Sequence, residues 1–228
     1  MSAAPSHFKQ ARTAALQGEG TPVSALRWAV LLAAGLLLAG APLRAHQDAD
    51  PHAYQRLEVD EPAPAFKLIN QHAKPMALAD FRGKVLVVTF LFTQCTDVCP
   101  VLPQMLARVD ERLSEAQRAK LHFIGISVDA AHDTPERLRS FIQQRSLSDQ
   151  RWTLLTGSLA ALSKTAADYG VVVRPDPRAG FVHNTVFVVI DAKGRERVEF
   201  HGLATPTDDI ARAVRGLIDE AARPARKR

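Results

Sequence analysis

The feature that most constrains this chain is an uncharged run of residues that leads directly into its only two cysteines. Val85 to Phe92 is apolar apart from one threonine and is rich in β-branched and aromatic side chains, which is typical of a buried central strand. Cys95 and Cys99 follow within the sequence TQCTDVCP. Any fold that contains this segment must therefore bury a strand whose end leads into a pair of thiols.

The residues after the cysteines predict a helix, because apolar side chains recur at helical spacing between Val101 and Lys120. The first turn of a helix offers unpaired N–H groups and a partial positive charge, which lower the pKa of a nearby thiol. If the helix includes residues from Val98 onwards, the spacing of four places both sulfurs on one side. The pair is then either a redox dithiol or half of a site for a soft metal ion.

Composition and charge argue against two classes of protein. The chain of 228 residues is 46% hydrophobic and 23% charged, which suits one well-buried domain with tails. Its net charge of +5 comes from the two ends, because residues 1–45 and 223–228 are basic whereas the rest is slightly acidic. The body therefore lacks the basic face of a nucleic-acid-binding protein. Two cysteines in a single motif also argue against a scaffold built on disulfides.

The N-terminal part of the sequence predicts a membrane segment. Residues 1–22 are a polar, basic-biased leader, and residues 23–43 are apolar apart from one arginine, which is about the length that spans a bilayer. The basic flank predicts a cytoplasmic leader. We therefore expect a single-pass protein of the bacterial inner membrane with its soluble domain in the periplasm. Cleavage after Ala41 or Ala45 is the alternative, and residues 44–61 are expected to be an unpatterned linker.

Between residues 62 and 222 the sequence alternates between strand and helix patterns, and a basic tail, 223–228, follows. The expected strands are a hairpin at 66–78 and single strands at 85–92, 121–128, 152–157, 184–190 and 196–200. The expected helices are 101–120, one that begins at Pro135 behind the N-cap Thr134, 159–169 and 207–222. Residues 174–181, with two prolines, are expected to form a loop. This order predicts an α/β, thioredoxin-like fold with a mixed central sheet flanked by helices.

One histidine is a candidate third ligand beside the thiols. His183 follows the proline-containing loop and immediately precedes an apolar strand. Two thiolates and one imidazole form a soft, low-coordinate set that suits Cu(I) and, with added ligands, Cu(II). A structural zinc site normally has a fourth protein ligand. The other histidines are expected to be solvated or structural, and they are His7, His46, His52, His72, His122, His132 and His201.

Three segments, in order, resemble the signatures of the Sco/SenC family. They are FLFTQCTDVCPVLPQM, ISVDAAHDTPERLRSF and VHNTVFVVIDAKG. The resemblance covers roughly residues 62–202, and it implies a thioredoxin-like Sco domain over 62–222 whose copper ligands are Cys95, Cys99 and His183. Asp97, between the cysteines, and Asp129, at a strand end, either point at this site or serve only a solvated loop and a helix-entry turn.

The resemblance implies a copper chaperone rather than an enzyme. Such a protein delivers copper to the binuclear copper centre of cytochrome c oxidase during assembly, so the copper-bearing subunit of the oxidase is the expected partner. Other copper chaperones and thiol reductants are further possible partners. The alternative is a thiol–disulfide oxidoreductase that reduces the cysteines of the copper target, with Cys95 and Cys99 as the reactive pair.

Overall fold

The computed structural model describes residues 54–95, 101–177 and 180–223. The strands are β1 Gln55–Pro62, β2 Lys67–Asn70, β3 Pro75–Ala77, β4 Val85–Leu91, β5 Leu121–Ser127, β6 Trp152–Thr156, β7 Val173–Asp176, β8 Gly180–His183, β9 Val186–Ile190 and β10 Arg195–His201. The helices are α2 Val101–Glu111, α3 Glu115–Arg118, α4 Pro135–Gln144, α5 Leu159–Asp168 and α6 Thr207–Ala222, with a 3-10 turn η1 at Leu78–Phe81.

Eight of the strands form one mixed sheet in the order β1-β10-β9-β4-β5-β6-β2-β3. The predicted central strand is β4, and every residue in it is buried. β4 pairs in parallel with β5 and antiparallel with β9, and β5 pairs in parallel with β6. The sheet centre is therefore built from strands that are apolar on both faces, as the continuous hydrophobic runs predicted.

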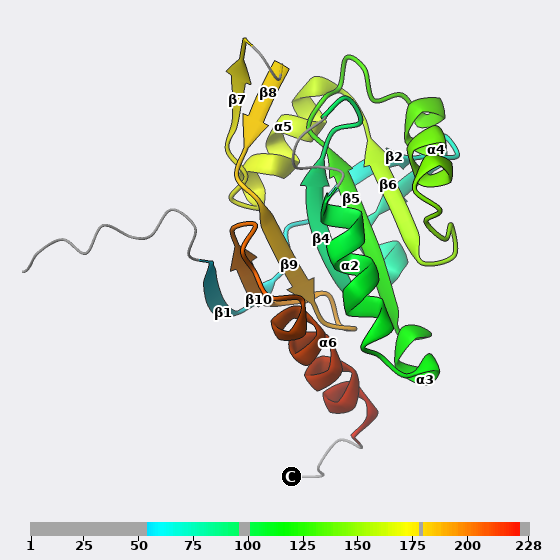
Figure 1. Cartoon of the computed structure of the whole chain (residues 1–228), viewed down its shortest axis with the longest axis vertical. Coiled ribbons are helices and arrows are strands. Elements are labelled where there is room, and N and C mark those ends of the chain that lie inside the picture. Colours follow the sequence, from blue (N-terminus) through cyan, green and yellow to red (C-terminus); the bar gives the residue numbers. More distant parts are fainter. Residues whose placement is uncertain (1–53, 96–100, 178–179, 224–228) are drawn as a thin grey trace, which may run out of the picture. The chain divides into compact units, whose positions relative to one another are not determined.

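Helices cover both faces of this sheet, as predicted for the fold class. Figure 1 shows α2 and α6 side by side in front of the sheet, with α5 behind it. Behind the sheet, Tyr169 at the end of α5 packs its ring against Phe90 of β4, with the ring centroids 5.9 Å apart. α4 begins at Pro135 behind the N-cap Thr134, and α6 has the bounds expected from the sequence.

The expectation of an unpatterned linker over residues 44–61 is wrong for its second half. Gln55–Pro62 forms β1, an edge strand that pairs antiparallel with β10. The strand was missed because only two apolar residues, Leu57 and Val59, alternate with its charged residues, and nearly all of its side chains are exposed. Gln55 lies opposite His201, which in turn lies opposite Val186. β1 therefore starts at the end of the sheet where β9 starts and β4 finishes.

The single helix expected over residues 101–120 is two helices. α2 ends at Glu111, and Ser114 begins α3 by accepting a hydrogen bond from the N–H of Gln117. The Gln117 side chain accepts one in return from the N–H of Ser114, which completes a capping box.

Among the residues that the structure describes, no helix is long and apolar enough to cross a membrane. The expected span at 23–43 lies outside those residues.

Candidate functional site

The first predicted ligand, Cys95, lies just beyond the end of the central strand. Its N–H donates to the carbonyl oxygen of Phe92 at 3.3 Å, which closes a tight turn directly after β4. The Cys95 side chain is half-buried and packs against the hydrophobic core. The thiol is therefore held near the surface at the carboxyl end of β4. Cys99 and Asp97 lie outside the described residues.

The second predicted ligand, His183, is at the end of a two-stranded ribbon. The expectation of a loop at 174–181 is wrong, because β7 and β8 pair antiparallel there and Val173 lies opposite His183. Neither strand belongs to the main sheet, and Figure 1 shows the ribbon projecting beside α5. A ribbon bonded only to itself needs no long apolar run, so its prolines and glycine suggested a loop.

Phe92 joins the two ligand-bearing segments. Its ring packs edge-on against the imidazole of His183, with ring centroids 6.2 Å apart, and against Phe181 at the same separation. The same residue accepts the backbone hydrogen bond from Cys95. The structure thus brings Cys95 and His183 to the same end of the sheet, where one contacts the backbone and the other the ring of Phe92. Within the described chain no three histidine, cysteine or acidic groups form a metal-binding cluster.

The hydrogen bond of His183 defines which ring nitrogen can bind a metal. Its Nδ1 lies 3.0 Å from the carbonyl oxygen of Asn184, and because a carbonyl only accepts hydrogen bonds, Nδ1 carries the proton. Nε2 then keeps its lone pair for a metal ion, the usual arrangement in histidine ligands. Burial lowers the pKa of His183, which the bond to Asn184 partly opposes. The ring is therefore a neutral donor at physiological pH.

Asn184 holds the histidine in place, and the sequence did not point to it. Its Oδ1 accepts from the N–H of Val172 at 2.8 Å, and its Nδ2 donates to the carbonyl oxygen of Gly170 at 3.1 Å. Both partners lie between the end of α5 and the start of β7. The asparagine therefore ties the chain entering the ribbon to the chain leaving it, and its own carbonyl orients His183.

A buried acidic network lies at the carboxyl end of β5. Asp133 is 1% exposed, and its carboxylate accepts hydrogen bonds from Thr93, two residues before Cys95, and from Ser127. Asp129 is also buried, and it accepts from the N–H groups of Ala131 and His132 and pairs with His132 Nδ1 at 2.7 Å. These contacts of Asp129 are those of the helix-entry turn considered above.

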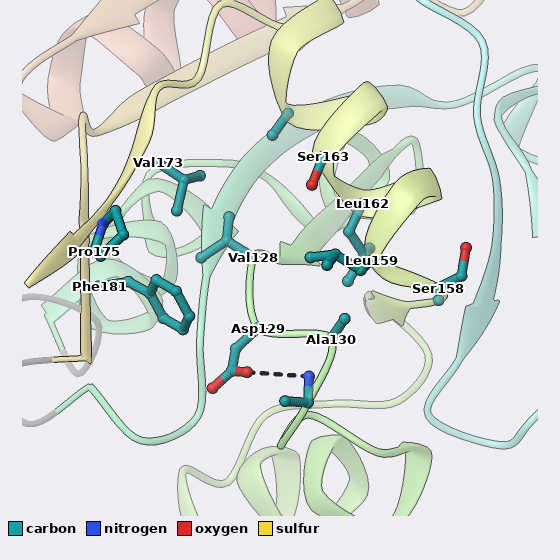
Figure 2. A pocket seen from close by; sticks show the side chains of 13 residues that line it. Val128, Asp129, Ala130, Ser158, Leu159, Leu162, Ser163, Val173, Pro175 and Phe181 are labelled. Atoms are coloured by element: carbon teal, nitrogen blue, oxygen red, sulfur yellow. Dashed lines mark hydrogen bonds between the residues drawn. The ribbon is translucent and has the colours of Figure 1, made fainter.

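A cavity of about 620 Å³ adjoins this turn and the ribbon. Figure 2 shows Asp129 and Val128 on one side of it, Leu159 and Leu162 of α5 on another, and Phe181 on the ribbon side. The dashed line in the figure is the bond from Ala131 to Asp129. Phe181 also contacts Phe92, so the cavity and the surroundings of the two candidate ligands share a wall.

Of the further histidines, His122 has the structural surroundings expected of it, whereas His201, expected in a loop, is the last residue of β10. His122 Nε2 lies 2.9 Å from Thr153 Oγ1, and the ring packs on Phe81. Burial lowers its pKa to about 4, assisted by the charge of Lys84. His72 pairs with an aspartate on the surface, and His201 pairs with Glu199. His7, His46 and His52 lie outside the described residues.

Comparison with known proteins matches most of this chain to one family model, described as SCO1/SenC, over residues 55–219. A SCO1 protein homolog of Bacillus subtilis is 28% identical over 154 residues, which cover 66% of this chain and 79% of the relative. Protein sco1 of Schizosaccharomyces pombe is 27% identical and is covered over 58% of its length. A mitochondrial SCO1 homolog of Homo sapiens is 28% identical, and the match covers 46% of that relative's length.

Solved structures show the same fold. A SCO1/SenC family lipoprotein from Bacillus anthracis has a TM-score of 0.62 and 32% identity, and the match covers 72% of this chain and 98% of that one. Arabidopsis thaliana ScoI, solved with copper bound, also has a TM-score of 0.62, at 23% identity over 70% of this chain and 99% of the other. These likenesses support the thioredoxin-like architecture predicted from the sequence.

Proposed function

Because this chain belongs to the SCO1/SenC family, we propose that it is a copper metallochaperone whose ligands are Cys95, Cys99 and His183. The observation that carries the proposal is the state of His183. Its Nδ1 is committed to the carbonyl of Asn184, so Nε2 keeps a lone pair, and the ring packs on Phe92, the residue on which the turn of Cys95 closes. Two thiolates and a neutral imidazole are a set that prefers Cu(I). Copper is the cargo in this proposal.

The destination we propose is the binuclear copper centre of cytochrome c oxidase, through its copper-bearing subunit. One solved relative, BsSco, is described as a member of the Sco family of cytochrome c oxidase assembly proteins, and this description supports the destination. Transfer would proceed by ligand exchange, in which a thiolate of the acceptor replaces one protein ligand at a time. Cys95 and His183 are each only half-buried, which leaves the approach that such exchange requires.

A second candidate function is thiol–disulfide exchange by Cys95 and Cys99 with the acceptor's cysteines. One observation favours it: BsSco, a 25% identical structural relative, is described as having a disulfide switch. In this reaction a thiolate attacks the target disulfide, a mixed disulfide forms, and the second thiolate releases the reduced target. The two electrons come from the cysteine pair, which ends as a disulfide. His183 is not required for this step.

We further propose that residues 23–43 anchor the protein in the bacterial inner membrane, with the domain in the periplasm. Cleavage after Ala41 or Ala45 is the alternative. The apolar run, its basic flank and the acidic residues after it support this orientation. A periplasmic reporter fused to Arg228 tests the side on which the domain lies. A cytoplasmic C-terminus would exclude both the orientation and the proposed partner.

The substitution His183→Ala separates the two candidate functions, with His201→Ala as the matched control because His201 is also half-buried. Cu(I) is titrated into the reduced full-length chain against a chromophoric competitor, and disulfide reduction is measured on the same samples. We expect about one Cu(I) per chain in the wild type and in His201→Ala, and at least tenfold weaker binding in His183→Ala with reductase activity retained. Unchanged copper affinity in His183→Ala would refute the ligand assignment.

A further inference from the structure

Asp133 is a buried carboxylate that accepts hydrogen bonds from the loop of Cys95 as well as from the end of β5. It is 1% exposed, and it accepts from the Thr93 N–H at 3.1 Å, from Thr93 Oγ1 at 2.5 Å and from Ser127 Oγ at 2.6 Å. A buried carboxylate is costly unless such donors surround it. In the described chain these bonds lead to the ends of β4 and β5, forty residues and six residues away respectively.

Other residues hold the turn around Asp133, so the Asp133 carboxylate remains available to bond Thr93. Thr134 is the N-cap of α4 and accepts from the N–H of Arg137. Asp129 accepts from the N–H groups inside the turn. Thr134 and Asp129 therefore already cap the N–H groups of this turn and of the start of α4.

The bonds to Asp133 begin where the main sheet stops holding the chain. The N–H of Val128 donates to the carbonyl oxygen of Leu91 at 3.0 Å, immediately beyond the paired residues Leu91 and Ser127. Two residues later Thr93 gives both its N–H and its hydroxyl to Asp133. Cys95 comes after two more residues and closes its turn on Phe92. Asp133 thus extends the support of the sheet to the cysteine turn.

We propose that Asp133 is a positioning residue that, through Thr93, fixes the turn carrying the thiol of Cys95. The effect that we expect on copper binding rests on the proposed function, whereas the effect that we expect on the reactivity of the Cys95 thiol does not. Without the Thr93 hydroxyl bond, the turn samples several orientations. The Cys95 sulfur then spends less time where both the metal and an attacking reagent find it.

The test compares Thr93→Val, which keeps the shape of the side chain but removes its hydroxyl donor, with Thr93→Ser, which restores the donor. Asp133→Ala is a harsher variant that leaves three donors without this acceptor, two from the half-buried Thr93 and one from the buried Ser127. The control is Asp191→Ala. Asp191 is likewise buried and accepts from two backbone N–H groups, of Lys193 and Arg195, but it lies in the β9–β10 turn at the other end of the sheet.

Two properties of the full-length chain are measured in mild detergent. The first is the pH profile of Cys95 alkylation by iodoacetamide in metal-free protein carrying Cys99→Ser, so that one thiol reports. The second is Cu(I) affinity with both cysteines present. We expect Thr93→Val to change the alkylation rate at least threefold and to weaken copper binding about tenfold, as the loss of an outer-shell partner does. Thr93→Ser restores both values, and Asp191→Ala changes neither.

Equal effects of Thr93→Val and Asp191→Ala on both properties would overturn the proposal, because only general destabilisation would then remain. A normal profile in Thr93→Val would overturn it as well. If the wild type binds no copper, the proposed function fails, and the alkylation profiles still decide the role of Asp133.

Discussion

Acidification should destabilise this domain through one half-buried histidine that lies far from the candidate ligands. His122 in β5 packs on Phe81 and lies beside Thr153 Oγ1, and burial, assisted by Lys84, lowers its pKa from 6.5 to about 4. The folded protein therefore keeps the ring neutral at pH values where the unfolded chain is already protonated. This contribution to stability is fully present above pH 6.5 and is lost as the pH falls towards 4.

The size of the effect follows from the shift in pKa. Each pKa unit corresponds to about 1.4 kcal/mol of differential interaction, so the full shift corresponds to about 3 kcal/mol at a pH below both values. Between pH 7 and pH 5 the loss is about 2 kcal/mol, because the folded ring is still neutral while the unfolded one is charged. That is a large fraction of the stability of a typical domain.

The assay is urea unfolding at pH 7 and pH 5, followed by the fluorescence of the buried Trp152, for the wild type and for His122→Gln. Glutamine can still bond Thr153 but does not titrate. Every other ionisable group is common to the two proteins, so the difference between their pH dependences isolates His122. We expect the wild type to lose about 2 kcal/mol more than the variant. Parallel pH dependences would refute the assignment of a half-buried, neutral histidine.

Two other substitutions test the electrostatics of the sheet and the support of the ribbon. Burial, followed by the interaction with Glu199, raises the pKa of Glu196 to about 8, so the stability of the folded protein should fall as the pH rises from 5 to 8. Glu196→Gln should remove this fall when the thermal unfolding temperature is measured against pH. The same pH dependence in the variant and the wild type would contradict the raised pKa. Asn184→Ala loses two hydrogen bonds and should cost about 1–3 kcal/mol in urea unfolding as well as weakening Cu(I) binding. Asn70→Ala, which removes a similar pair of bonds in a distant turn, should lower stability alone; equal copper affinities in the two would contradict the role of Asn184.

The central part of the fold could be predicted because its buried residues follow clear apolar patterns in the sequence. β4 is apolar on both faces, and α6 shows one apolar stripe at helical spacing, so both were found with nearly their observed bounds. β1 and the ribbon of β7 and β8 were missed, because edge and isolated strands keep many side chains exposed and carry too few apolar residues to mark them clearly.

The candidate site divides in the same way. Cys95 and His183 could be named from their residue types and their places at the ends of strands. Asp133 and Asn184 could not, because their roles depend on hydrogen bonds to Thr93 and Val172, which are distant in the sequence. The DTP sequence that contains Asp133 predicted only the start of α4. Tertiary contact, rather than local pattern, gives both residues their importance.

The position of β1 has a consequence for how far the site can travel. β1 begins at Gln55, opposite His201, at the end of the sheet that also holds Cys95 and His183. The chain from residue 44 to residue 54 extends at most roughly 40 Å, at about 3.6 Å per residue. If residues 23–43 are held in a membrane, as proposed, the chain enters the domain at the end of the sheet that carries Cys95 and His183. This short linker would confine copper exchange to a region close to the bilayer surface.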